Sequence, residues 1–156
     1  MRTVIQRALG ARVYIDGGLY SEIPRGLLIL AGVSKNDEPD DIKYMARKCA
    51  GLRIFEDAQG KMNLSVSDVG GELLIVSNFT LYGDCSHGRR PNFTAAENTP
   101  RAEELFEAFI MECRELGLTV KTGSFGADMK VELTNDGPVT IIMDTEEMRK
   151  NDGKKE

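Results

Sequence analysis

Side chains that could carry out chemistry gather in the stretch SNFT, residues 77–80. This stretch follows the apolar run ELLIV, so the hydroxyls of Ser77 and Thr80 and the amide of Asn78 stand where a buried strand reaches the surface. Ligands bind preferentially at strand ends in sheets covered by helices. The same polar groups could equally do no more than satisfy loose backbone groups at the end of the strand. The residues alone leave both interpretations open.

A second stretch of interest is TNDGPVT, residues 134–140. It lies between MKVEL and VTIIMD, which both have the apolar character of strands. Asp, Gly and Pro are the residues that most often make turns, because Gly tolerates positive φ and Pro fixes φ. From the residues alone, Gly137-Pro138 is therefore best interpreted as a tight turn between two strands.

Other catalytic groups are scarce. A Ser-His or Cys-His mechanism would have to use His87, the single histidine, which lies in the polar stretch YGDCSHGRRPNF. A zinc site requires three or four ligands. Cys49 and Cys113 fall on the apolar stripes of expected helices, so the candidate ligands that remain are Asp84, Cys85 and His87. No glycine-rich phosphate-binding motif is present. We expect neither a metal nor a cofactor.

Eight apolar runs have the length of strands. GLLIL and ELLIV are continuous rather than alternating, which predicts central strands with both faces covered. DAQGK, residues 57–61, is typical of a hairpin turn in which Gly60 takes a positive φ.

Two segments have the pattern of helices. Residues 39–51 place apolar side chains on one stripe and end at a glycine. Residues 99–117 do so more strongly, with Thr99 as the expected cap and Pro100 at the first helical position. The sequence thus predicts an α+β fold. We expect one compact domain, residues 1–148, with a mixed, barrel-like β-sheet and two main helices, followed by a polar tail, residues 149–156.

Composition excludes several classes of protein. The chain has 156 residues, of which 41% are hydrophobic and 29% charged, and this is typical of a single globular domain. No apolar run approaches the roughly 20 residues that span a bilayer. The net charge of −5 argues against broad coating of a nucleic acid, although it allows a grip on a short terminus. Three widely spaced cysteines fit a reducing compartment, and we expect a cytoplasmic protein.

The order and spacing of several motifs resemble those of the D-aminoacyl-tRNA deacylases. The paired motifs are SNFTL at residues 77–81 and NDGPVT at residues 135–140. VIQRAL, GLLILAGV, GLRIFEDAQGKMNLSVSDVGGELLIVS, GRRPNF and GSFGADMKVELTNDGPVT extend the likeness over nearly the whole chain. One residue departs from the family pattern, because Asn78 stands where the family usually carries Gln. Asn keeps the amide but shortens its reach by one methylene.

The resemblance implies hydrolysis of the ester that joins a D-amino acid to the 3′ end of tRNA, with glycyl-tRNA mischarged on tRNA-Ala as a further substrate. It implies a homodimer in which a cis Gly137-Pro138 dipeptide enters the partner's pocket. Consecutive carbonyls on one side of that dipeptide would receive the α-ammonium, and the rigid backbone would collide with an L side chain. The implied partner is the aminoacylated end of tRNA, with no DNA and no membrane.

The resemblance also implies roles for single residues. The backbone N–H groups of Phe79 and Thr80 would stabilise the oxyanion, while Ser77 and Asn78 shape the pocket. The 2′-hydroxyl of the terminal adenosine would help to activate water. In the alternative mechanism, the Thr80 hydroxyl is a nucleophile, although no base is evident beside it.

Further residues are candidates for supporting roles. Arg7 would brace the Gly-Pro segment, and Asn135 would support it. Met129 would line the pocket, although its alternation with other apolar residues equally suits the core. Arg89 and Arg90 would contact RNA phosphates, or else belong to an ordinary solvated loop.

Two other functions stay open from the sequence. One is a Thr80-dependent hydrolase of another small ester or amide. The other is a non-catalytic module that binds an RNA end, with Asn78 marking a loss of activity.

Overall fold

In the computed structural model of the chain, which describes residues 1–152, two apolar strands occupy the middle of one sheet. β3 (Gly26–Gly32) and β6 (Glu72–Ser77) run parallel to each other. Alternate side chains of both strands belong to two separate apolar clusters, one on each face of the sheet. The prediction of central strands covered on both faces is confirmed.

The sheet is mixed and curls into a nearly closed barrel. Its strand order is β2-β1-β3-β6-β7, and β8 pairs with β1. The sequence suggested separate short strands, but β1 (Arg2–Ile15) and β8 (Lys130–Asp144) are each one long strand. β1 pairs with β3 through its first half and with β2 (Gly18–Ile23) through its second half, while β8 follows it antiparallel. β7 (Val120–Thr122) extends the sheet parallel to β6.

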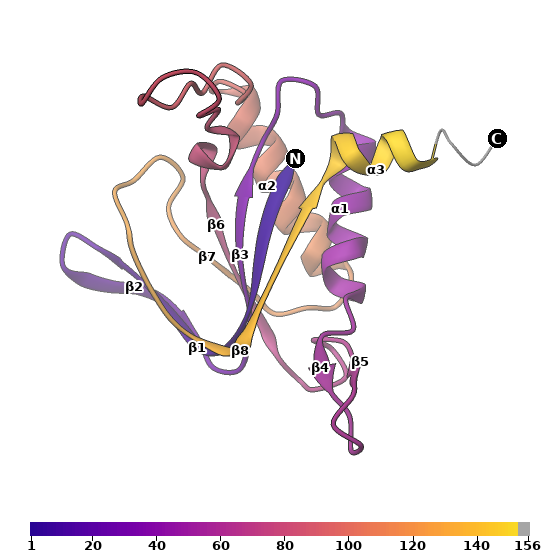
Figure 1. Ribbon diagram of the computed structural model, residues 1–156. Helices are drawn as coiled ribbons and strands as arrows, with labels where there is room; N and C mark the ends of the chain where they lie inside the picture. The colour runs from indigo at the N-terminus through magenta and orange to yellow at the C-terminus, as the bar shows by residue number, and fades with distance from the viewer. Residues whose placement is uncertain (153–156) are drawn as a thin grey trace.

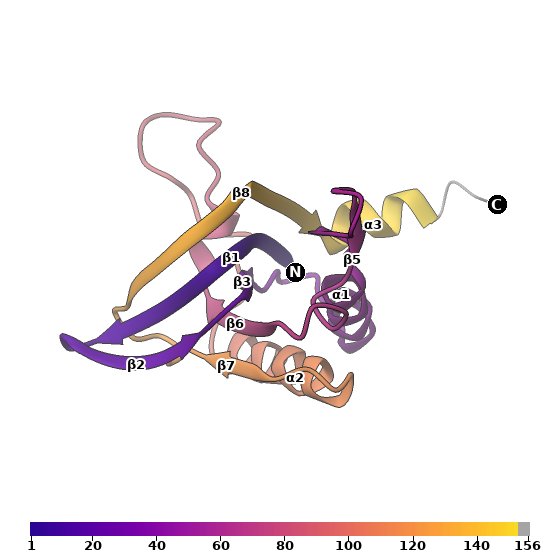
Figure 2. The same cartoon turned by 90° about the horizontal axis from the view of Figure 1, so that it is seen from below.

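Figures 1 and 2 show α1 and α2 side by side against one face of this sheet. α1 (Pro39–Gly51) matches the predicted helix. α2 (Arg101–Glu115) begins later than expected, and the prediction of Thr99 as its cap is wrong. Pro100 occupies the capping position after a cis Thr99-Pro100 bond, because the chain enters helical geometry only at that proline.

Two small elements follow the first helix. β4 (Phe55–Glu56) and β5 (Met62–Leu64) form a two-stranded hairpin. Gly60 in its turn has φ 75°, as predicted from DAQGK. The hairpin lies beyond the end of α1 in Figure 1.

A third helix, α3 (Thr145–Asp152), was missed from the sequence, where two main helices were expected. It is short and mostly polar, so its apolar pattern is weak; Met148 packs on the core and the Asp144 carboxylate accepts the Glu146 N–H at 2.9 Å. α3 runs through the first part of the expected tail, residues 149–156, of which 153–156 lie outside the described residues. No helix within residues 1–152 is long and apolar enough to cross a membrane.

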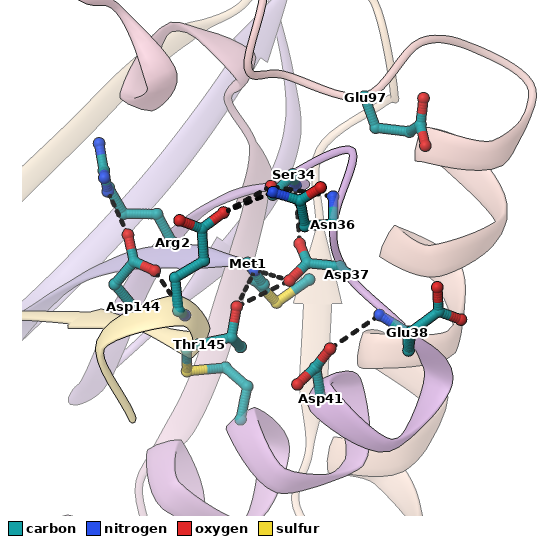
Figure 3. Close-up of polar contacts among 12 residues, drawn as sticks. Met1, Arg2, Ser34, Asn36, Asp37, Glu38, Asp41, Glu97, Asp144 and Thr145 are labelled. Atoms are coloured by element: carbon teal, nitrogen blue, oxygen red, sulfur yellow. Dashed lines mark hydrogen bonds and ion pairs between the residues drawn. The ribbon is translucent and has the colours of Figure 1, made fainter. Parts of the chain in front are cut away.

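The start of the chain and the start of α3 meet in a buried polar cluster (Figure 3). The Met1 ammonium contacts the Asp37 carboxylate and the Thr145 hydroxyl, and all three residues are buried. The Asp37 carboxylate also accepts the Ser34 N–H at 2.6 Å and the Thr145 hydroxyl at 2.7 Å. Every polar group of this cluster therefore has a partner, as burial requires.

Candidate functional site

The SNFT stretch forms a tight turn at the end of β6. Asn78 leads into a 3₁₀ turn, η1 (Phe79–Tyr82), and its backbone N–H still bonds to the Ala31 carbonyl of β3 at 2.8 Å. The turn packs directly on the end of β3 at Gly32, where a Cβ would lie 2.8 Å from the Asn78 carbonyl oxygen. Glycine at this position is thus a condition for the close approach of the turn.

The Asn78 side chain caps the turn. Its Oδ1 accepts the Thr80 N–H at 3.1 Å and also the Thr80 hydroxyl. Within residues 1–152, the Phe79 N–H has no protein acceptor. One donor in the turn is therefore free for a ligand, whereas Thr80 N–H must give up the Asn78 contact first.

A cavity of about 900 Å³ opens beside this turn. Ser77, Asn78, Phe79 and Thr80 all line it. Met129 lines the cavity and also packs against the smaller apolar cluster. The cavity is large enough for a small molecule or for the end of a larger one.

The Gly-Pro segment is a bulge inside one strand, not a turn between two. On either side of it, Thr140 pairs with Gln6 and Asn135 pairs with Ala8. Residues 136–139 of β8 therefore face only Arg7 of β1 and leave the ladder. The bond between Gly137 and Pro138 is cis, as the resemblance implied, and both residues are exposed.

Arg7 and Asn135 hold this bulge. Arg7, only 5% exposed, donates from Nε to the Asp136 carbonyl at 2.9 Å and from Nη1 to the Ile54 carbonyl at 2.8 Å. Asn135 accepts the Val139 N–H at 2.7 Å and donates to the Val139 carbonyl at 3.2 Å. These contacts make the exposed bulge a rigid element, because each end is tied by hydrogen bonds.

The cavity and the bulge of one chain do not meet. Among the described residues, neither Gly137 nor Pro138 lines the cavity beside η1. Gly137 and Pro138 thus lie outside the cavity of their own chain, although Asn135 of the same motif donates at 3.1 Å to Gln6, which lines it. A ligand in the cavity would touch the SNFT turn without touching the Gly-Pro bulge of the same chain.

The remaining candidates lie on the loop between η1 and α2, which projects from the body of the protein in Figures 1 and 2. Arg89 and Arg90 are exposed in this loop. Phe93, at its base, packs edge-on against Phe79 with 5.2 Å between ring centres. His87 is exposed, contacts the Ser86 hydroxyl at 2.8 Å and does not line the cavity, so nothing here unites it with the SNFT turn.

The cysteines do not contribute a nucleophile to the cavity. Burial raises the pKa of the Cys113 thiol to about 12 and raises the pKa of Cys49 still further. Both thiols stay protonated near neutral pH, and their place in the core confirms the predicted helix stripes. Cys85 is exposed on the projecting loop. In residues 1–152, no three potential His, Cys, Asp or Glu ligands cluster as a metal site would require.

Several cavity residues were not singled out from the sequence. Gln6, Glu97, Asn98, Phe106 and Phe125 all line the cavity. The Asn98 N–H and Arg101 hold the pKa of the Glu97 carboxyl below its usual value, so a carboxylate borders the cavity. No local pattern marks these residues, because they come from four segments that only the fold brings together.

The amino-acid sequence is similar to those of known proteins. The sequence model of the family described as D-Tyr-tRNA(Tyr) deacylase matches residues 4–144. A D-aminoacyl-tRNA deacylase of Clostridium botulinum (strain Eklund 17B / Type B) is 53% identical over 145 residues, which cover 93% of this chain and 97% of that protein. These matches confirm the resemblance drawn from the motifs.

Two solved structures share the fold. One, titled "c-Myc DNA Unwinding Element Binding Protein", superposes with a TM-score of 0.87 at 40% identity and covers 92% of this chain and 98% of that one. The other, titled as a probable eukaryotic D-amino acid tRNA deacylase, gives a TM-score of 0.77 at 15% identity over 91% of this chain and 97% of that one. The second likeness concerns the fold alone.

Proposed function

The chain belongs to the D-Tyr-tRNA(Tyr) deacylase family, a family of hydrolases, and from this premise we propose how it removes D-amino acids from tRNA. Water attacks the carbonyl carbon of the ester, and the 3′-oxygen of the terminal ribose leaves with a proton. The site binds the aminoacyl group in the cavity beside η1 and holds the tRNA end at its rim. The exposed Gly137-Pro138 bulge is the observation that carries this proposal, because it supplies a rigid backbone wall with no other evident use.

The free Phe79 N–H supports an oxyanion mechanism. Phe79 lines the cavity, and its N–H has no acceptor in the described chain. A fixed backbone donor stabilises negative charge that develops on the ester oxygen, and loss of such a donor costs about a hundredfold in rate. In this proposal Thr80 N–H is the second donor once the substrate displaces the Asn78 amide. Ser77 shapes the pocket, and the tRNA 2′-hydroxyl assists the attacking water.

Selection of the D form is assigned to the bulge of a second copy. A single chain does not place Gly137-Pro138 in its own cavity, so a homodimer that exchanges bulges would complete both sites. The backbone wall would exclude an L side chain and leave a D side chain free to point outward. Arg7 and Asn135 keep the wall rigid through their contacts with Asp136 and Val139.

The wall would recognise no side chain and would therefore accept glycine. We include glycyl-tRNA mischarged on tRNA-Ala among the substrates for this reason. Arg89 and Arg90 on the projecting loop are assigned to the RNA phosphates, because this loop begins directly after η1 and both side chains are exposed.

Paired hydrolysis assays with D-tyrosyl-, L-tyrosyl- and glycyl-tRNA test this function. We expect rapid release from the D-tyrosyl and glycyl substrates, and release from the L-tyrosyl substrate at the uncatalysed rate. Equal release from both tyrosyl isomers would remove the backbone wall from the mechanism. Tight binding of tRNA without release from any substrate would favour the non-catalytic RNA-end-binding module instead.

The Thr80 hydroxyl is expected to be dispensable. It donates to the amide oxygen of Asn78, and an amide oxygen is too weak a base to activate it. In the variant Thr80→Val, which keeps the backbone N–H, we expect kcat on D-tyrosyl-tRNA to stay within about tenfold of the wild type. Loss of more than about a thousandfold, or a trapped acyl-threonine seen by mass spectrometry, would establish the nucleophilic alternative.

A further inference from the structure

Arg2 connects the start of the chain to the turn that carries Phe79. Its Nη1 donates to the Leu81 carbonyl at 2.8 Å, and its guanidinium carbon lies 4.8 Å from the ring centre of Tyr82. Its Nε donates to the Asp144 carboxylate at 2.8 Å. Figure 3 draws this contact between the two side chains. One planar side chain thus spans two residues of η1 and the end of β8.

Strong anchors hold the guanidinium in place. The backbone of Arg2 pairs with Gly32 of β3 and with Asp144 of β8. Asp144 is 5% exposed, and its second oxygen accepts the Glu146 N–H at the start of α3. A charged pair with a nearly buried carboxylate restricts the side chain far more than a solvent-exposed pair does.

The part of η1 that carries Phe79 is held weakly by the protein. The bond from Leu81 N–H to the Asn78 carbonyl is long, at 3.5 Å, and Phe79 is 59% exposed. Asn78 caps the beginning of the turn, while the charged bond from Arg2 to Leu81 and the bond from Gly83 N–H to the Thr80 carbonyl, at 3.0 Å, hold its end. Movement of Leu81 would tilt the peptide plane that carries Phe79 N–H, because the Asn78 carbonyl lies in that plane and accepts the Leu81 N–H.

We propose that Arg2 is a positioning residue that fixes the direction of the Phe79 N–H through the Leu81 carbonyl and the Tyr82 ring. This inference rests on the proposed role of Phe79 N–H in the reaction. Arg2 does not line the cavity and so acts only through the turn. Lysine cannot replace it, since a single ammonium lacks the fork that reaches Asp144 and Leu81 together.

Arg12 provides a matched control. It lies on the same strand, is 51% exposed and also pairs with two groups, the carboxylates of Glu22 and Glu132. None of its contacts involves η1 or the cavity of the SNFT turn. Substitution of Arg12 therefore removes a similar arginine from β1 without disturbing the turn.

The test compares Arg2→Gln, Arg2→Lys and Arg12→Gln in steady-state hydrolysis of D-tyrosyl-tRNA. We expect both Arg2 variants to lose about tenfold or more in kcat, with KM changed by less than about twofold, because the donor direction matters in the transition state. Arg12→Gln should retain the wild-type kcat. Unchanged kcat in folded Arg2→Gln and Arg2→Lys, or a change confined to KM, overturns the proposal.

Backbone amide resonances give a readout that does not depend on activity. In ¹H–¹⁵N spectra we expect the Phe79 and Thr80 amides to shift or broaden in Arg2→Lys and to stay in place in Arg12→Gln. Unmoved Phe79 and Thr80 amides in Arg2→Lys would overturn the positioning role even if kcat fell. A wild-type chain that leaves D-tyrosyl-tRNA intact would overturn the proposed function, while the amide resonances would still report whether Arg2 places the turn.

Discussion

The substitution Gly137→Ala is expected to lower kcat/KM for D-tyrosyl-tRNA about a hundredfold. Gly137 has φ 141°, and an added Cβ would lie 2.7 Å from Val139 Cγ2 and 2.8 Å from Val139 N. Val139 is itself buried and tied to Asn135, so Gly137 and Pro138 rather than Val139 must move. A displacement on the order of 1 Å at a substrate-positioning wall costs about that much in rate. Hydrolysis assays with the D and L substrates measure it.

Gly17→Ala is the matched control for this prediction. Gly17 also has a positive φ, 76°, but nothing lies within 4 Å of the position of its added Cβ. Backbone strain is thus introduced in the turn between β1 and β2 without a clash, and activity should stay near that of the wild type. Full activity of Gly137→Ala would show that the bulge does not touch the substrate.

Mixing two inactive variants tests whether the bulge acts on another copy. Gly32→Ala should disturb the SNFT turn, since its Cβ would lie 2.8 Å from the Asn78 carbonyl oxygen. A dimer of one Gly32→Ala copy and one Gly137→Ala copy contains one intact pocket facing one intact bulge. Unfolding and refolding the mixture should restore activity that neither variant has alone. No recovery, in a preparation shown to contain mixed dimers, would contradict the exchange of bulges.

The substitution Gly26→Ala is expected to have the largest effect on stability. β3 and β6 pair at Gly26 and Glu72, and an added Cβ would lie 1.8 Å from the Glu72 carbonyl oxygen and 2.7 Å from its nitrogen. The strands must separate there, because both clashing atoms belong to the backbone. We expect the free energy of unfolding to fall by about 3 kcal/mol or more, measured by urea denaturation.

Gly51→Ala controls for the general effect of adding a methyl group. Gly51 ends α1, and nothing lies within 4 Å of the position of its added Cβ. Its substitution should change the free energy of unfolding by less than about 1 kcal/mol. If Gly26→Ala proved as stable as Gly51→Ala, this would contradict the claim that β3 and β6 lie too close at Gly26 to accept a methyl group.

The two predictions concern different parts of one arrangement. Gly26 lets the parallel pair form, and β6 then delivers the SNFT turn at its far end beside Gly32. Gly137 shapes a bulge on β8, which pairs with β1 rather than with β3 or β6. Gly26→Ala should therefore lower stability and activity together, whereas Gly137→Ala should lower activity with a smaller change in stability.

The sequence by itself determined the central strands, the two main helices and the family. Continuous apolar runs predicted β3 and β6, because a strand covered on both faces needs apolar residues at every position. Periodic apolar stripes predicted α1 and α2 in the same way. The motifs SNFTL and NDGPVT identified the family through their residues and spacing, without any knowledge of where they lie in space.

Only the tertiary structure decided what the Gly-Pro segment is and what surrounds the SNFT turn. The segment has the composition of a turn, yet pairing of β8 with β1 on both sides makes it a bulge, and Arg7 fills the space beneath it. Local sequence cannot specify this, since the partner strand lies more than a hundred positions away along the chain. Arg2 reaches Leu81 for the same physical reason: strand pairing places them together, and no pattern near either residue records it.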